Sequence, residues 1–395
     1  MISCYGGLIF NNTIPDQHHP CVQPVALGRP QRVCLHLQCR GYLHDPRCQL
    51  PLKNGALNRA EPWTTYTPAY YEQVFGVIEA FKNFDNVLGF FAGNEVINED
   101  STLTTPAYVR AVVRDMKQYI AKNSKRAIPV GYSAADVRPI LTSTAAYFEC
   151  DLKNSTESRA DFFGLNSYSW CGDATYQSSG YNVLTEDFSN ATLPVQALYG
   201  EEMTQAFSGG LVYEWTEEEN EYGLVNVNNS DTVTTLIDYK NLQAQFAKID
   251  MDRITTSNKT QTSINPPECA ADLITADDFY NSWDLPAAPS KVSDYIKNGL
   301  PDAPSGSPVS VTGKTISQKV YDYTGKEITG VKFVVKSNGE ANAPSPTNSD
   351  SGSSTSSTSS TSASASTSTG AASINSAPIA MTGVSGFFML LASLL

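Results

Sequence analysis

The sequence predicts an α/β fold over its central part, most simply a (β/α)8 barrel (TIM barrel). Short apolar runs typical of buried strands occur at residues 87–92, 127–132, 161–168 and 210–215. Apolar residues recur at helical spacing in the segments 70–84 and 106–122. Short strands that alternate with helices indicate βα units and a parallel sheet. Because several of these strands end in polar or aromatic residues, we expect the barrel arrangement.

Composition narrows the class of protein. The 395 residues include 27 Lys and Arg against 40 Asp and Glu, a formal net charge of −13. Nucleic-acid binding needs clustered Lys and Arg, so this balance argues against a nucleic-acid partner. Hydrophobic residues make up 41% of the chain, which is enough to bury a core and excludes a wholly disordered protein.

The cysteines indicate disulfides in an oxidising compartment. No Cys-x-x-Cys pair occurs, so we expect no metal site. Wide spacing favours disulfides instead, and the eight cysteines are Cys4, Cys21, Cys34, Cys39, Cys48, Cys150, Cys171 and Cys269. Five Asn-x-Ser/Thr sequons are compatible with secretion, namely at Asn11, Asn154, Asn190, Asn228 and Asn258. The first ten residues, however, carry no recognisable signal peptide.

The C-terminal part predicts attachment to a membrane surface. Residues 341–376 are mostly Ser, Thr, Ala and Pro, which indicates a disordered, O-glycosylated stalk. Residues 377–395 end in an apolar run with no Lys or Arg behind it, typical of a glycolipid (GPI) anchor signal. Candidate attachment residues are Gly370 and Asn375. The alternative is a tail-anchored transmembrane helix, which needs about 20 apolar residues.

Asn94 and Glu95 form the sharpest local signal. They directly follow the apolar run 87–92. A carboxylic acid at the C-terminal end of a barrel strand lies where barrel enzymes perform chemistry, and it suits a general acid. The adjacent amide can bind a substrate hydroxyl. The alternative interpretation is a helix N-cap Asn followed by a Glu that the helix dipole favours.

Three segments together resemble the fungal β-1,3-glucanosyltransferases of glycoside hydrolase family 72. They are LGFFAGNEV (88–96), SRADFFGLNSYSWCG (158–172) and SGGLVYEWTEEENEYGLV (208–225), and the resemblance covers roughly residues 57–302. It implies a retaining mechanism on a (β/α)8 barrel, with β-1,3-glucan as substrate. It further implies no cofactor, a monomer, and a location at the cell surface and in the cell wall.

The resemblance also implies roles for individual residues. Glu95 matches the acid/base and Asn94 its neighbouring amide. Tyr168 matches a tyrosine that holds the nucleophile or the sugar, and Tyr181 and Tyr222 match aromatic platforms of the glucan cleft. Each tyrosine could instead be a core aromatic. Cys150 and Cys269 match a disulfide of the family.

The chain departs from the family in two places. The strand that carries the family's nucleophile is missing, because Leu193–Val195 runs directly into the following helix; Cys171 thereby loses its expected partner. Among nearby acids (Glu201, Glu202 and Glu214) Glu214 is the least unfavourable substitute. Residues 1–55 match poorly and look irregular. We therefore expect an incomplete catalytic barrel at 56–302, followed by a small β-rich appendage at 303–340.

The expected function is a 1,3-beta-glucanosyltransferase that cleaves a wall glucan and joins it to another chain, with impaired activity in this sequence. One alternative is a GPI-anchored β-1,3-glucan-binding protein without catalysis. Another is a plain β-1,3-glucanase, in which water resolves the glycosyl-enzyme intermediate. A third is that the missing segments reflect a mis-predicted exon.

Overall fold

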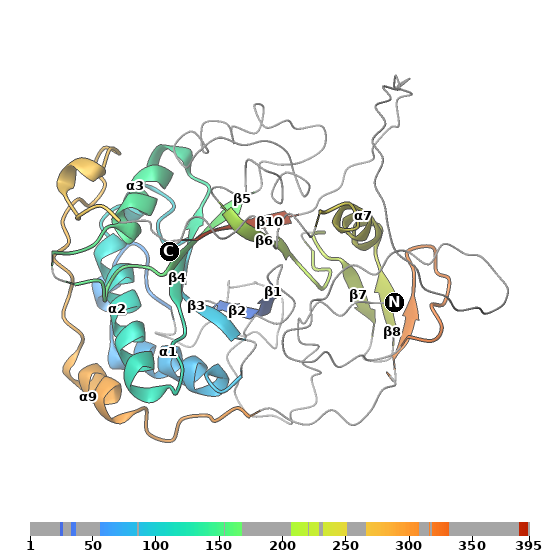
Figure 1. Cartoon of the computed structure of the whole chain (residues 1–395), viewed down its shortest axis with the longest axis horizontal. Coiled ribbons are helices and arrows are strands. Elements are labelled where there is room, and N and C mark those ends of the chain that lie inside the picture. Colours follow the sequence, from blue (N-terminus) through green and yellow to red (C-terminus); the bar gives the residue numbers. More distant parts are fainter. Residues whose placement is uncertain are drawn as a thin grey trace, which may run out of the picture.

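A computed structural model gives the fold (Figure 1). The structure describes residues 24–26, 33–36, 56–84, 87–153, 155–167, 207–219, 221–228, 232–250, 266–307, 316, 318–331 and 387–393. For residues 24–26, 33–36, 207–210 and 387–393 it describes the backbone.

The helices agree with the helical periodicity of the sequence. α1 (Pro68–Phe81) and α2 (Pro106–Asn123) confirm the two predicted helices to within a few residues. Each begins with a proline, which suits the first turn because its missing N–H needs no partner there. The other α-helices described are α3 (Arg138–Glu149), α7 (Ile237–Phe246) and α9 (Ser290–Asn298), with short 3-10 helices at Pro62–Thr64, Asp100–Thr102 and Ala271–Leu273.

The main sheet in the described part of the chain has seven strands in the order β1-β2-β3-β4-β5-β10-β6. Their bounds are β1 Pro24–Ala26, β2 Val33–His36, β3 Val87–Asn94, β4 Val130–Ala135, β5 Phe162–Ser167, β6 Phe207–Tyr213 and β10 Phe387–Ser393. β2, β3, β4 and β5 are mutually parallel. β10 is antiparallel to both β5 and β6, so β6 runs in the same direction as β5. The sheet curves until its end strands, β1 and β6, contact each other.

Residues 1–55, which were expected to be irregular, contribute two strands to this sheet. β2 pairs parallel with β3, and β1 pairs antiparallel with β2. Each strand is only three or four residues long. Runs this short show no readable periodicity, and what makes them strands is the open edge of β3, which is a long-range feature.

The tail also differs from expectation, because part of the predicted anchor signal forms a strand. β10 pairs with β5 over Phe388–Ser393 and with β6 over Phe387–Ala392. An unpaired strand edge is a template for any extended apolar segment. The run FFMLLAS has the length and composition of a buried strand, and the backbone groups between β5 and β6 are thereby hydrogen-bonded.

A second, three-stranded sheet has the order β7-β8-β9. It comprises β7 (Val225–Asn228), β8 (Thr232–Thr235) and β9 (Lys319–Tyr321). The β-rich appendage predicted at 303–340 thus supplies one described strand, and that strand pairs parallel with β8.

The core lies between the main sheet and the helices α1, α2 and α3, which cover its outer face at the left of Figure 1. Phe75 of α1 stacks on Tyr119 of α2 with ring centroids 4.0 Å apart. Asp115 of α2 is fully buried and accepts hydrogen bonds from the hydroxyls of Tyr66 and Tyr71. Arg114 pairs with the same carboxylate, so this buried charge is neutralised.

Residues 267–288, which we call the strap, run across the outside of α3. The predicted disulfide is confirmed: Cys150, at the end of α3, bonds to Cys269 of the strap. Farther along, Trp283 stacks on Tyr147 at 5.0 Å and donates its indole N–H to the Tyr147 carbonyl. Thr275 and Ala276 donate their backbone N–H groups to the Ser143 hydroxyl.

We predict that proline at position 390 opens the sheet between β5 and β6. Leu390→Pro removes a backbone donor in the middle of β10, whereas Thr382→Pro lies before the strand and serves as the matched control. Hydrogen exchange of the β5 and β6 amides should accelerate only in Leu390→Pro. Equal protection in both variants would show that β10 does not pair these strands.

We also predict that Glu149→Gln stabilises the fold at alkaline pH. Burial raises the pKa of the Glu149 carboxyl to about 7. The unfolded chain ionises near pH 4.5, so the folded state loses stability as the pH rises from about 4.5 to about 7. Chemical denaturation should show the variant up to ~3 kcal/mol more stable at pH 8 and unchanged at pH 4. The exposed Glu61→Gln, as control, should change neither value.

Candidate active site

Glu95 lies at the C-terminal end of β3, where the sequence placed it. Its backbone N–H donates to the Ser133 carbonyl of β4 at 2.8 Å. Its φ is +52°, in the left-handed region that non-glycine residues seldom adopt. Such a conformation persists where the surrounding structure imposes it, and it is frequent at functional sites. The side chain is half-buried, so the carboxylate is held in place and remains accessible.

The Asn166 amide fixes the Glu95 carboxylate. Asn166, near the end of β5, donates to Glu95 Oε1 at 2.7 Å and to Asn94 Oδ1 at 2.8 Å. Its own carbonyl oxygen accepts from the Ser133 hydroxyl at 3.0 Å. Polar side chains from three adjacent strands therefore form one network that orients the acid.

Tyr132 supports the turn that follows Glu95. It is fully buried, and its hydroxyl accepts the Ile97 N–H at 3.1 Å. Its ring stacks on Phe148 of α3 with centroids 4.5 Å apart. Burial raises the pKa of Tyr132 well above its ordinary value, so the hydroxyl remains neutral beside the acid.

A second polar group lies at the ends of β4 and β5. The Ser167 hydroxyl donates to Asp136 Oδ2 at 2.7 Å. The Arg138 guanidinium also contacts this carboxylate, through Nη2 at 3.1 Å and through Nε. All three residues lie on the same edge of the sheet as Glu95, because β3, β4 and β5 are parallel.

Glu214 follows β6 at this same edge and is buried, with 6% of its surface exposed. Its backbone N–H donates to the carbonyl of Tyr222, the half-buried residue predicted to be a glucan platform. The Tyr222 ring contacts the Tyr213 ring at 6.4 Å. The sheet order separates β6 from β3 by β4, β5 and β10.

Several predicted residues lie outside the described part of the chain. They are Tyr168, Tyr181, Glu201, Glu202, Cys171, and the two attachment candidates Gly370 and Asn375. Within the described residues, no group of three or more His, Cys, Asp or Glu side chains is arranged to hold a metal ion.

Sequence reasoning missed Ser133, Asn166 and Asp136 as members of the site. A signal for them exists: each is a polar residue within or just after an otherwise apolar strand. Parallel strands bring such residues to one edge, as Ser133 and Asn94 show by their direct pairing across β4 and β3.

An acid at the C-terminal end of a parallel strand lies where barrel enzymes carry catalytic residues, and glycoside hydrolases use such acids. The comparisons with known proteins agree. The sequence profile of glycoside hydrolase family 72, the glucanosyltransferases, matches residues 48–250. The chain belongs to this family.

Relatives and solved structures show how far the likeness extends. The chain is 56% identical over 312 residues to 1,3-beta-glucanosyltransferase gel2 of Aspergillus fumigatus, covering 74% of this chain and 65% of that protein. It is 42% identical over 241 residues to GAS4 of Saccharomyces cerevisiae, covering 56% and 51%. Gas2p of the same yeast, solved with laminaritriose and laminaritetraose, aligns with a TM-score of 0.52 at 34% identity over 66% of this chain and 59% of that one. The chain thus spans less than two thirds of the length of these relatives.

We predict that Asn166→Ala destabilises the site. The substitution leaves Glu95, Asn94 and the Ser133 hydroxyl without their shared partner, which should cost about 1–3 kcal/mol in the free energy of unfolding. Chemical denaturation measures this cost. Asn98→Ala, in the loop that follows Glu95, is the matched control and should cost less than ~1 kcal/mol. Equal costs would contradict a central role for Asn166.

Proposed function

We propose that this chain acts on β-1,3-glucan as a 1,3-beta-glucanosyltransferase. The observation that carries the proposal is the Glu95 carboxylate, held by Asn166 and Asn94 at the end of β3. The names of its relatives, which are 1,3-beta-glucanosyltransferases from several fungi, support the choice of substrate and reaction.

In this proposal Glu95 acts twice. As an acid it protonates the glycosidic oxygen of the leaving glucan while a second carboxylate attacks the anomeric carbon. As a base it then takes the proton from a hydroxyl of the acceptor glucan, whose oxygen displaces the second carboxylate. Asn94 and Asn166 place two side-chain amides beside the acid, and amide groups can orient sugar hydroxyls.

The proposed mechanism needs a second carboxylate, and the described strands offer no well-placed residue for it. A retaining pair must lie about 5–5.5 Å apart. The strand between β5 and β6 in this structure is β10, and its sequence FFMLLAS carries no acid. Glu214, which follows β6 on this edge, is the candidate for that role in the described part of the chain. A transferase that relies on it is expected to turn over slowly.

The lack of a well-placed second carboxylate favours a second candidate function, a β-1,3-glucan-binding protein with little catalysis. The same edge has polar and aromatic side chains that suit a sugar, including Asp136 and Tyr222. Their presence does not depend on which residue supplies the second carboxylate. The two candidates differ in one measurable property, the appearance of products longer than the donor.

We predict slow elongation of laminarin oligosaccharides, at a rate at least ~100-fold below that of a gel2-type enzyme assayed in parallel. Glu95→Gln should abolish it, and Glu214→Gln should do so as well if Glu214 attacks the sugar. Chromatography measures product lengths, and calorimetry measures binding of the same oligosaccharides. Binding without elongation would favour the glucan-binding protein, and neither would contradict both candidates.

We further propose that the protein resides at the cell surface, held by a glycolipid at Gly370 or Asn375. The Ser/Thr-rich stalk and the apolar tail support this location. No described helix is both long and apolar enough to cross a bilayer. Release from intact cells by a phosphatidylinositol-specific phospholipase would support the anchor, and retention after that treatment would contradict it.

A further inference from the structure

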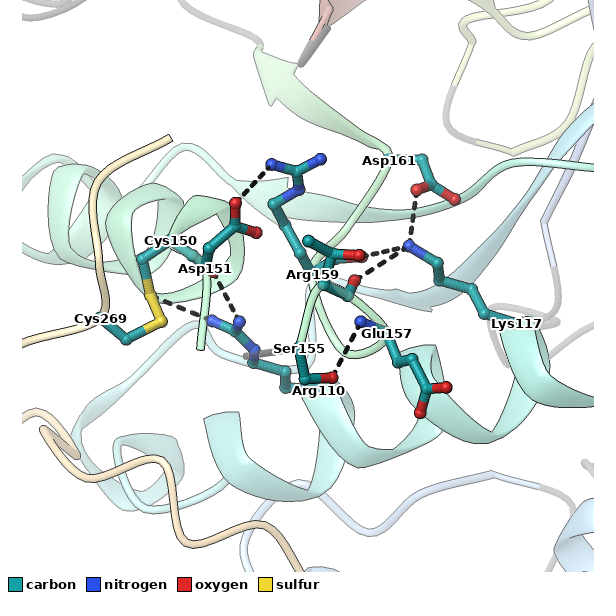
Figure 2. Close-up of polar contacts among 10 residues, drawn as sticks. Arg110, Lys117, Cys150, Asp151, Ser155, Glu157, Arg159, Asp161 and Cys269 are labelled. Carbon is teal, nitrogen blue, oxygen red and sulfur yellow. Dashed lines mark hydrogen bonds and ion pairs between the residues drawn. A yellow bond between two sulfur atoms is a disulfide. The ribbon is translucent and has the colours of Figure 1, made fainter. Parts of the chain in front are cut away.

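Arg110 is a fully buried cation at the end of α3 (Figure 2). It projects from α2, and its Nη2 donates to the Cys150 carbonyl at 2.6 Å. Its Nη1 donates to the Tyr147 carbonyl, and its Nε donates to the Ser158 hydroxyl at 3.1 Å. Tyr147 and Cys150 belong to the last turn and the cap of α3, where the helix dipole is negative and a cation is favoured.

The charge of Arg110 is not paired with a carboxylate in the described part of the chain: the acceptors of its hydrogen bonds are carbonyls, a hydroxyl and a sulfur. Burial lowers the pKa of Arg110 to about 10, so the guanidinium remains positive at neutral pH. A buried cation whose hydrogen-bond acceptors are neutral stabilises a negative charge that forms beside it.

The two sulfur atoms of the disulfide beside Arg110 have different surroundings. Arg110 Nη1 lies 3.2 Å from Sγ of Cys150, and Figure 2 shows the guanidinium directed at that sulfur. Cys150 is fully buried, whereas Cys269, in the strap, is partly exposed. An external reagent therefore approaches the disulfide from the Cys269 side, while the cation lies on the Cys150 side.

We propose that the Cys150–Cys269 disulfide is a directional thiol-exchange site, modified at Cys269 by a small thiol. The thiolate of the small thiol forms a bond to Sγ of Cys269 as the Cys150–Cys269 bond breaks. Cys150 leaves as a thiolate, and Arg110 stabilises its negative charge. The small thiol is then joined to Cys269 as a mixed disulfide. Exchange is faster when the leaving thiolate is stabilised, and an adjacent Arg provides that stabilisation.

The other charged side chains near the two sulfurs do not offset the stabilisation of a Cys150 thiolate by Arg110. Asp151 pairs with Arg159 at 3.1 Å, and Glu268, beside Cys269, is exposed. Burial raises the pKa of Glu149, which precedes Cys150, to about 7, so at pH 7 this side chain is only partly ionised. Arg110 is thus the charged group in hydrogen-bonding contact with the leaving sulfur.

Opening the disulfide does not release the strap. Trp283 remains stacked on Tyr147, and the Tyr147 hydroxyl donates to the Ser282 carbonyl at 2.7 Å. The Arg114 guanidinium donates to the Pro286 carbonyl at 2.8 Å. The product of exchange is therefore expected to be a folded protein that carries the thiol on Cys269.

The test is exposure of the folded chain to reduced glutathione at pH 7, acid quenching, and mass-spectrometric mapping of the adduct. We expect glutathione on Cys269 at least ~10-fold more often than on Cys150. Arg110→Met should slow the first exchange by roughly tenfold, because the leaving thiolate loses its cation. Arg110→Lys, which keeps the charge, should restore part of the rate.

Lys117→Met is the matched control. Lys117 lies on the same helix and binds the same loop, through the Arg159 carbonyl at 2.9 Å and the Asp161 carboxylate at 2.6 Å, with no contact to either sulfur (Figure 2). It should leave the exchange rate within ~2-fold of the parent. Equal slowing in both methionine variants would overturn the proposal, as would an adduct on Cys150.

Because Arg110→Met removes several buried hydrogen bonds, a second measurement uses Cys269→Ser, which retains Arg110. The rate of Cys150 alkylation by iodoacetamide, mapped by mass spectrometry as a function of pH, gives the pKa of its thiol. A value below the ~8.5 of a free thiol supports the proposal, and a value at or above it overturns it.

Discussion

Close parallel pairing of β3, β4 and β5 is the constraint on which the candidate site depends. A Cβ atom at Gly131 of β4 would lie 2.5 Å from the Phe162 carbonyl oxygen, and one at Gly89 of β3 would lie 2.9 Å from the Pro129 carbonyl oxygen. Only glycine permits this approach. The resulting register brings Asn94 opposite Ser133, and it places Asn166 within hydrogen-bonding distance of Glu95. The orientation of the acid thus follows from backbone spacing as well as from its direct partners.

The sequence alone predicted the parts of the structure that depend on local pattern. α1, α2, β3, β5 and Glu95 were all predicted, because apolar periodicity and a polar strand end are visible within a short window. The Cys150–Cys269 disulfide came from the family resemblance, since spacing alone leaves the pairing of eight cysteines open. Ser133 and Asn166 were missed because their role exists only after three strands are aligned. β1, β2 and β10 were missed because their conformation depends on the edges they pair with.

The two sides of the main sheet differ in what they offer to catalysis. On the side of β3, β4 and β5, the side chains of Ser133, Asn166 and Ser167 have defined partners. On the side of β6, the described strand next to β5 is the antiparallel and apolar β10, whereas a retaining pair needs a second acid. Binding of a sugar depends on the edge as a whole, whereas double displacement depends on two acids at a fixed separation. Under the proposed function, a site with one well-held acid is therefore expected to lose catalysis much more than recognition.

The C-terminal tail is subject to two incompatible demands. As an anchor signal, residues 377–395 would be removed when the glycolipid is attached, so the anchored protein would lack β10. As a strand, the same residues satisfy the backbone groups of β5 and β6, whose exposure would invite edge-to-edge association. An anchored form must therefore pair β5 with β6 directly or cover both edges with another segment. Because β5 carries Asn166, which donates to the Glu95 carboxylate at 2.7 Å, a change in this pairing would alter the orientation of that carboxylate. If the proposed anchor is attached, membrane attachment and the geometry of the acid would thus be coupled through β10.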